Sequence, residues 1–281
     1  MDRKTQTSGS TGVDARLAST DGDRRLRDVV ESEIIPRLVH AYAQPAGNAH
    51  ERQLIRPAEV EAFTRALLER TPEHAQKLLD FHCERGIPLE SIYLQLFVGA
   101  AHLLGAWWES DESNFSQVTL AMTRIHAMLN ELSPSFHAGA MRSPLERGSE
   151  RRILMATLPG QHHTLGLSIL SEFFRREGWV VLAIPSPEPG LIQASLSTHW
   201  FDLLALSASL DAEVDDLGST ILAARKTSLN PRLAIMIGGP LLTRQPQLGT
   251  ALGADGVSSD AVDALALAQR LVQAQREVRL N

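Results

Sequence analysis

From residue 151 onward the sequence alternates short apolar runs with segments of helical periodicity, and this alternation restricts the possible folds more than any other feature. Each run is apolar along its length, which is typical of strands buried on both faces of a parallel sheet. The five runs occupy residues 151–159, 180–185, 202–209, 233–240 and 253–259. The pattern therefore predicts an α/β domain over residues 151–281, with five parallel strands in a doubly wound sheet.

Residues 25–139 show a different pattern, in which apolar side chains recur at helical spacing and no strand-like alternation occurs. The long fourth segment is apolar on most of its circumference, which predicts the central helix of a bundle. The predicted helices run through Leu26–Leu38, from Pro57, from Thr71, over Leu89–Trp108 and through Val118–Met128. We therefore expect an all-α bundle of four or five helices ahead of the α/β domain.

Two polar segments flank this predicted bundle. Residues 1–24 are rich in Ser, Thr, Gly and Asp and nearly lack large apolar groups, so we expect a disordered tail. Residues 140–150 are polar, contain proline and glycine and lack periodicity, which indicates a linker.

Composition excludes several classes of function. The net charge of −6 argues against nucleic-acid binding through the whole surface, and no DNA-binding domain is expected before the first helix. The single cysteine, Cys83, excludes an intrachain disulfide and a cysteine-based zinc site. We expect no membrane span and no signal peptide, and hence a cytoplasmic protein. A dinucleotide fingerprint and a substrate barrel are both lacking, so a stand-alone enzyme is not expected.

The loops that follow three of the predicted strands carry the residues of greatest chemical interest. Ligands of doubly wound, Rossmann-like sheets bind beyond the carboxyl ends of the strands. A loop histidine can ligate a metal through neutral imidazole, and a nearby glycine is expected to let the next helix pack closely on the sheet. A small hydroxyl residue beside a glycine pair would leave a slot for a bulky flat group. The three loops are Gly160–Gly166, which contains His162 and His163, Ser207–Leu210, and Gly238-Gly239-Pro240.

Each of these elements alone has an ordinary structural explanation, because histidine occurs in turns and both Ser and Gly-Gly-Pro commonly end strands. Their joint order resembles the cobalamin-binding domain of methionine synthase, methylmalonyl-CoA mutase and the corrinoid regulators. His163 and Gly166 match that family's first element, Ser207 its second, and Gly238-Gly239 its third. The resemblance implies a cobalamin cofactor with His163 as the cobalt ligand on the lower face, and His162 as the alternative ligand.

The same resemblance assigns further residues to the cofactor site, and two of these residues differ from the family pattern. Gln161 stands where the family usually has Asp, and Ser209 where it has Leu. A carboxylate behind a metal-bound histidine raises its basicity, which glutamine does poorly, so methyl transfer is disfavoured while binding is not. The remaining residues implied for the lower site are Thr164, Leu165, Leu210 and Pro240.

The predicted bundle resembles the helical cap that covers the upper face of the corrin in methionine synthase and in light-sensing cobalamin regulators. Trp108, with Trp107 beside it, matches the tryptophan of those regulators, although either ring could instead be a core residue at a helix end. Val118 and Thr119 replace their Glu-His pair, and Met122 follows on the same helix. The smaller side chains imply a small upper ligand, such as water, hydroxide or methyl.

The WWESDES turn at residues 107–113, the QHHTLG loop at residues 161–166 and the expected lack of a DNA-binding domain together resemble the AerR/PpaA group of cobalamin-binding antirepressors, and the resemblance runs across residues 25–280. This implies light-responsive control of photosystem genes through a repressor of the PpsR/CrtJ type, without direct nucleic-acid binding. His102 and His126 are candidates for a second cobalt ligand that occupies the upper position after illumination. Two alternatives remain open, namely a corrinoid carrier subunit of a methyltransferase system and a haem or redox sensor in the same fold.

Overall fold

The computed structural model describes residues 54–138, 150–161, 164–258 and 260–277. The tail, the helix expected over Leu26–Leu38, nearly all of the linker, His162 and His163 lie outside these described residues. The chain from Ile55 onward forms one compact unit, which contains both the helical region and the sheet.

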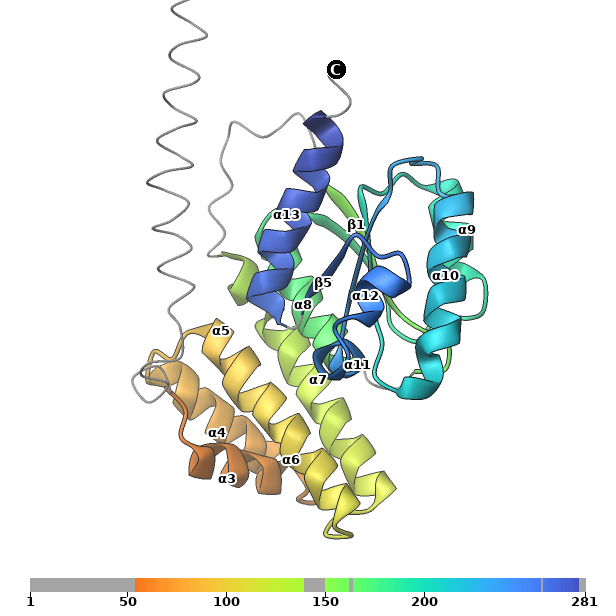
Figure 1. Ribbon diagram of the computed structural model, residues 1–281. Coiled ribbons are helices and arrows are strands. Elements are labelled where there is room, and N and C mark those ends of the chain that lie inside the picture. The colour runs from red at the N-terminus through yellow and green to blue at the C-terminus, as the bar shows by residue number, and fades with distance from the viewer. Residues whose placement is uncertain (1–53, 139–149, 162–163, 259, 278–281) are drawn as a thin grey trace, which may run out of the picture. The chain divides into compact units, whose positions relative to one another are not determined.

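The helical region has the helices that the apolar periodicity predicts within the described part of the chain (Figure 1). The segment predicted as one long helix is continuous, but a π-helical stretch lies within it. The elements are α3 (Pro57–Leu67), α4 (Glu73–Glu84), α5 (Leu89–Ser91), the π-helical η2 (Ile92–Phe97), α6 (Val98–Glu109) and α7 (Phe115–Ala138).

Aromatic rings form the centre of the helical core. Tyr93 stacks on Phe136 with ring centroids 4.7 Å apart, and Phe63 and Phe97 continue the stack. Phe173, which belongs to the sheet domain, meets Phe136 edge to face at 5.1 Å. Arg176 from the same helix pairs with Glu90 of α5. Leu165, Ile169 and Phe173 of the sheet domain therefore belong to the apolar core of the helical region.

Among the described residues one segment, Leu89–Glu109, is long and apolar enough to cross a membrane by length and composition alone. The sequence interpretation expected no such segment. Its large side chains Ile92, Leu96 and Leu104 are buried within the helical core, and a core helix of a globular domain passes the same test.

The second part of the chain forms the predicted five-stranded parallel sheet, with the strand order β2-β1-β3-β4-β5 (Figure 1). The strands are β1 (Arg152–Thr157), β2 (Val180–Ile184), β3 (Leu203–Ser207), β4 (Ala234–Gly238) and β5 (Gly256–Ser258). Because β1 lies between β2 and β3, the strand order reverses there, and ligands of such sheets bind outside the carboxyl ends at this switch point.

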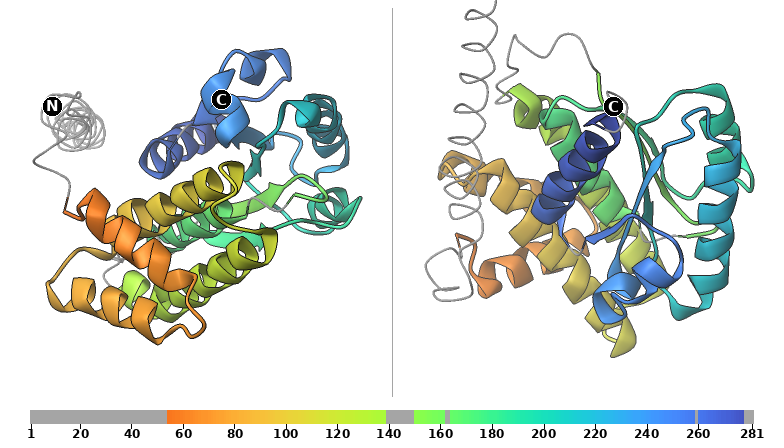
Figure 2. Two further views of the ribbon diagram at one scale, coloured as in Figure 1. Left: turned by 90° about the horizontal axis from the view of Figure 1, so that it is seen from below. Right: turned by 45° about the horizontal axis from the view of Figure 1, so that its top comes forward.

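Helices cover both faces of the sheet (Figure 2). Alternate strand residues divide between the faces, as the two-residue repeat of a strand requires. On one face Leu154 and Leu204 pack under α9 (Leu191–Thr198) and α10 (Val214–Thr227). The helices of the opposite face are α8 (Leu165–Arg176) and α13 (Ala261–Glu277), and short helices η4 (Asp211–Glu213), α11 (Pro240–Arg244) and α12 (Leu248–Ala251) connect the strands.

The edge strand β2 departs from the sequence prediction. Val180 and Leu182 are exposed, although all five runs were expected to be buried on both faces. β2 pairs with β1 alone, and its other edge has no neighbouring strand among the described residues. The apolar run therefore predicted the strand correctly but overestimated how fully it is covered.

Candidate functional site

The carboxyl ends of four strands meet in one row at the expected edge of the sheet. Thr157 of β1 is paired in register with Ser207 of β3, and Ser207 with Gly238 of β4. Gly238 is in turn paired with Ser258 of β5. The structure thus brings together the Ser and Gly elements that the sequence singled out. Thr157 and Ser258 were not anticipated, although each is the last residue of its strand and could have been found by alignment of the strand ends.

The glycine pair after β4 is required by close packing of backbone. A Cβ atom at Gly239 would lie 2.4 Å from the carbonyl oxygen of Ala208 and 2.8 Å from Oγ of Ser207. A Cβ atom at Gly238 would lie 2.8 Å from the carbonyl oxygen of Ser258. Gly239 also has φ +97°, which favours glycine. The sequence suggested that these glycines line an open slot. This interpretation is wrong for the space that their Cβ atoms would occupy, because the ends of the neighbouring strands already lie there.

Gly166 is the reverse case. It was expected to let the helix after β1 pack closely on the sheet, but no atom of the described residues lies within 4 Å of the position that its Cβ would occupy. Gly160, at φ +78°, is equally open. Close packing against the described part of the protein therefore does not explain Gly166.

The loops after β1 and β3 are joined by a carboxylate that sequence reasoning missed. Glu213 is only 6% exposed, and it accepts a hydrogen bond from Nε2 of Gln161 and a second, of 2.9 Å, from the backbone N–H of Ser209. Arg244 of α11 donates to the carbonyl of Ser209 at 3.1 Å, which ties in the loop after β4. Gln161 and Ser209, the two departures from the family pattern, are therefore both bonded to Glu213.

The other predicted residues of these loops have different environments. Leu165 is buried and belongs to the helical core cluster, so it packs against protein. Thr164 accepts a hydrogen bond from Ser168 through its carbonyl, and Pro240 is the exposed first residue of α11. Leu210 is 49% exposed beside the buried Ser209, which is unusual for a large apolar side chain at a strand end.

The neighbouring tryptophans at the end of α6 are separated by the fold. Trp107 packs against the helical core, and the guanidinium of Arg65 lies 4.9 Å from its ring centre. Trp107 is therefore used at least in part for packing within the helical region, the alternative that the sequence left open for one of the two rings. Trp108 is 52% exposed.

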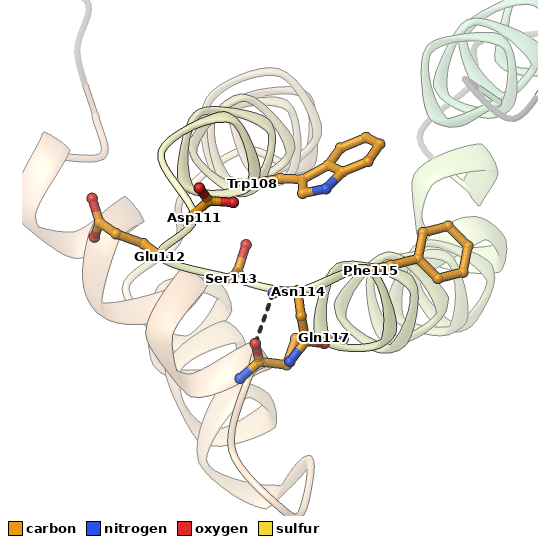
Figure 3. Close-up of a pocket in the computed structure, with 7 residues that line it drawn as sticks. All are labelled: Trp108, Asp111, Glu112, Ser113, Asn114, Phe115 and Gln117. Atoms are coloured by element: carbon orange, nitrogen blue, oxygen red, sulfur yellow. Dashed lines mark hydrogen bonds between the residues drawn. The ribbon is translucent and has the colours of Figure 1, made fainter.

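A pocket of about 370 Å³ lies at the turn between α6 and α7. Figure 3 shows the rings of Trp108 and Phe115 extending to the same side of this turn, while Glu112 points the other way. Phe115 is 70% exposed and was not anticipated, because it is an isolated aromatic residue after a polar loop. Two exposed aromatic rings on one side of a turn are suited to cover a flat apolar group.

Ser113 forms part of the same pocket and has a buried hydroxyl. Its side chain is 6% exposed, and Oγ has no hydrogen-bond partner among the described residues. Its neighbours Asn114 and Gln117 exchange hydrogen bonds between side chain and backbone, of 3.0 and 2.9 Å, at the start of α7. Asn114 and Gln117 are therefore engaged in the local fold, whereas the hydroxyl of Ser113 is buried without a partner among the described residues.

Along α7 the candidate residues form a stripe at helical spacing. Val118 and Met122 are partly buried against the helical core, and Thr119 is exposed. His126 lies four residues after Met122, and its Nδ1 is 2.8 Å from the Met122 carbonyl oxygen, so Nδ1 carries the proton in this contact. His102 is exposed on α6. Within the described ranges no three His, Cys, Asp or Glu side chains gather to hold a metal ion.

The fold defines a class of protein, namely a helical region joined to a Rossmann-like parallel sheet. Residues 151–267 match the family described as B12 binding domain. The match assigns cobalamin as the cofactor of this domain and assigns no catalytic reaction to it.

Individual proteins are also similar to this chain, and two of them are described here. An uncharacterized 20.5 kDa protein in the bchF-crtJ intergenic region of Rhodobacter capsulatus is 25% identical over 174 residues, which are 62% of this chain and 88% of that protein. The monomethylamine corrinoid protein of Methanosarcina barkeri has a similar structure, with a TM-score of 0.61, 14% identity, and coverage of 78% of this chain and all of that one. The structural similarity supports the fold, in which a helical region precedes the sheet.

Proposed function

We propose that this protein is a light-responsive cobalamin-binding regulator that acts on transcription through a repressor of the PpsR/CrtJ type. The observation that carries the cofactor site is the meeting of the β1, β3 and β4 loops at one sheet edge, where Ser207 and Gly238 are paired in register. His163, in the first of these loops, is the proposed cobalt ligand on the lower face, and His162 is the alternative.

The residues of the described part fit a large flat cofactor. Leu210, Trp108 and Phe115 are exposed although they are large and apolar, and within the described ranges no atom lies within 4 Å of a Cβ placed on Gly166. Burial of such side chains against a macrocycle would contribute roughly 25 cal/mol per Å² of apolar surface. The bound cofactor would supply a cobalt centre with exchangeable axial ligands, while the protein supplies the lower ligand and the aromatic cover.

Regulation is the favoured role because of the relative in Rhodobacter capsulatus, which is encoded between bchF and crtJ. A DNA-binding repressor must carry a basic surface, and the net charge of −6 is suited to such a partner rather than to DNA itself. The proposal therefore includes a protein partner, no direct nucleic-acid contact and a cytoplasmic location.

Light would act by exchange of the upper ligand, after which a histidine of the helical region would take the vacated position. His126 is favoured over His102, because it shares the α7 stripe with Val118 and Met122. Its Nδ1 donates to the Met122 carbonyl, so in the neutral ring Nε2 is the nitrogen that can ligate a metal.

The test is the visible spectrum of the protein reconstituted with hydroxo-, methyl- and adenosylcobalamin, recorded in the dark and after illumination. We expect binding of hydroxo- and methylcobalamin, a spectral change on illumination, and loss of the protein-specific spectrum in His163→Ala. His162→Ala is the matched control and should retain it. Unchanged spectra in His163→Ala would contradict the assigned ligand, and a copurifying haem would contradict the cofactor's identity.

A corrinoid carrier of a methyltransferase system is the second candidate, because the fold is similar to that of the corrinoid protein from Methanosarcina barkeri. Gln161 in place of a carboxylate disfavours this role, since methyl transfer changes the coordination of the cobalt in each cycle. Methylation of the reduced, reconstituted protein by a methyltransferase would favour the carrier role over the regulator.

A further inference from the structure

The outer edge of β2 is a surface that the proposed function does not use. β2 (Val180–Ile184) pairs with β1 alone, and within the described ranges no strand lies along its other side. Edge strands of natural proteins commonly carry a charge, a proline or a bulge that prevents further pairing. The sequence of β2 is VVLAI, and its five residues pair with β1 in continuous register. The strand therefore has none of these three protections.

The pairing with β1 determines which backbone groups of β2 face the free edge. The N–H of Val180 donates to the Arg151 carbonyl at 2.9 Å, so the backbone of Val180 faces β1. In a parallel ladder the backbone groups of successive residues point alternately to the two sides of the strand. Val181 and Ala183 therefore direct both their N–H and their C=O toward the free edge.

The side chains on one face of this strand are apolar and incompletely covered. Val181 and Ala183 pack on the face of the sheet that α8 and α13 cover, and Ile184 packs on the opposite face. Val180 and Leu182 share the face of Ile184, where they are 44% and 40% exposed. The free edge thus combines unpaired backbone groups with exposed apolar side chains, which favours the addition of another strand.

We propose that β2 of a second copy of this chain pairs antiparallel with this edge, about a two-fold axis that passes through Leu182. Val181 of each copy then lies opposite Ala183 of the other, and each such pair exchanges both backbone hydrogen bonds. Leu182 lies opposite its own counterpart and Val180 opposite Ile184, so the exposed side chains form an apolar ladder across the axis. The two-fold axis makes one surface its own partner.

The neighbouring residues disfavour the adjacent registers. An axis through Val181 would place Ala183 opposite Trp179, but the N–H of Trp179 already donates to the Phe174 carbonyl at 3.0 Å. An axis through Ala183 would place Val181 opposite Pro185, which has no N–H to donate. The register centred on Leu182 is therefore the one that pairs both outward-facing residues of each copy.

The size of the contact determines its strength. A stable interface involves about 20–30 residues on each side, whereas β2 supplies five. We therefore expect a weak, concentration-dependent dimer, with a dissociation constant on the order of 10–100 μM. Because the partner strand runs antiparallel, the carboxyl ends of the two sheets point in opposite directions, which leaves the candidate cofactor edge of each copy open. The contact involves no cofactor, so it does not depend on the proposed function.

Cysteine crosslinking of the full-length chain tests the position of the axis. Cys83, the single cysteine, is first replaced by serine, and Leu182→Cys is then oxidised with diamide, which takes up the two electrons and two protons that two thiols release. Opposed residues of a non-hydrogen-bonded pair have Cα atoms about 4.5 Å apart, within the roughly 4.4–6.8 Å that a disulfide spans. We expect a covalent dimer to form about 10-fold faster than in Leu222→Cys, because association raises the effective thiol concentration. Leu222 is the matched control, since it is 61% exposed on α10, outside the proposed contact.

A mixture of two single-cysteine chains tests the register. Val180→Cys alone should crosslink no faster than Leu222→Cys, because its counterpart lies four residues along the strand, about 14 Å away. Mixed with Ile184→Cys, it should form a mixed covalent dimer about as fast as Leu182→Cys does. Equal crosslinking of Val180→Cys with and without the second chain would contradict the proposed register.

Sedimentation velocity over a series of protein concentrations measures the association without crosslinking. Leu182→Lys would place two ammonium groups opposite each other, so it should weaken the dimer by about 10-fold or more, whereas Leu222→Lys should match the wild type. Thermal unfolding of each variant monitors folding. A wild-type chain that stays monomeric throughout, or a folded Leu182→Cys that crosslinks no faster than Leu222→Cys, would overturn the proposal, because the edge would then be open or covered by something other than a second copy.

Discussion

The sheet edge and the α6–α7 turn, the two regions that we propose contact the cofactor, are built in opposite ways. At the sheet edge, backbones approach closely at Gly239 and a buried carboxylate joins two loops. At the turn, Trp108 and Phe115 are exposed, and the hydroxyl of Ser113 has no partner in the described part of the chain. The edge is therefore organised before any ligand arrives, whereas the turn has surface that a ligand would cover.

This difference has an energetic consequence. A preorganised site loses little conformational freedom on binding, while exposed aromatic rings contribute mainly through the apolar area that they bury. Substitutions at the sheet edge should therefore change the stability of the apoprotein. Substitutions at the turn should mainly change the affinity for the cofactor.

The largest effect is expected for Gly239→Ala. The new Cβ would overlap the Ala208 carbonyl oxygen at 2.4 Å, and φ +97° is unfavourable for alanine. Strain and overlap together should lower the unfolding free energy of the apoprotein by about 3 kcal/mol or more, measured by urea denaturation.

Gly166→Ala is the matched control for this prediction. Its Cβ would meet no atom within 4 Å in the part of the chain that the structure describes, and alanine in a helix is about 0.5 kcal/mol or more stabilising relative to glycine. We expect an apoprotein at least as stable as the wild type, with weaker cobalamin binding if the cofactor occupies that space. Similar losses of stability in both variants would contradict the distinction drawn between the two glycines.

The second prediction separates the neighbouring tryptophans. Trp107→Ala removes a ring that packs on the helical core and should destabilise the apoprotein by about 2–3 kcal/mol. Trp108→Ala removes a ring that is 52% exposed and should change stability by less than about 0.5 kcal/mol, while weakening cobalamin binding about 10-fold. Thermal unfolding and a cobalamin titration measure the two effects, and a stable Trp107→Ala protein with impaired binding would reverse the assignment.

Most of the fold was predictable because it depends on patterns within short segments. The five apolar runs became five strands, and the helical stripes after Pro57 became helices, since burial of an apolar face determines both. The same periodicity distinguishes the two tryptophans. Ala100, Leu104 and Trp107 lie on the face of the helix that packs on the core, and Trp108 lies outside this face.

The details of the site could not be predicted in the same way, because they depend on distant segments. Gln161 and Glu213 are 52 residues apart, and no local pattern indicates that their side chains meet. The surroundings of Gly166 and Gly239 likewise depend on which strand or helix lies opposite each residue. The motif alone predicted close packing at Gly166 and a slot at Gly239, and the described residues show the reverse. Motif order located the sheet edge, and tertiary contacts determine what each residue does there.

The smallest effect is expected for Ser113→Ala in the turn. The hydroxyl is buried without a hydrogen-bond partner in the described residues, and burial of an unsatisfied polar group costs free energy. Its removal should therefore stabilise the apoprotein by up to about 1 kcal/mol, seen as a higher denaturation midpoint with an unchanged slope in urea.

Ser110→Ala is the control on the same turn, since the Ser110 hydroxyl lies within 3.2 Å of the Glu112 carboxylate and is exposed. It should change stability by less than about 0.5 kcal/mol, as a surface substitution does. If the Ser113 hydroxyl serves a ligand of the pocket, Ser113→Ala will gain stability as apoprotein and lose cobalamin affinity, so that the two measurements move in opposite directions. A destabilised Ser113→Ala apoprotein would instead mean that the Ser113 hydroxyl already stabilises the turn without a ligand. The turn would then be organised before binding, as the sheet edge is.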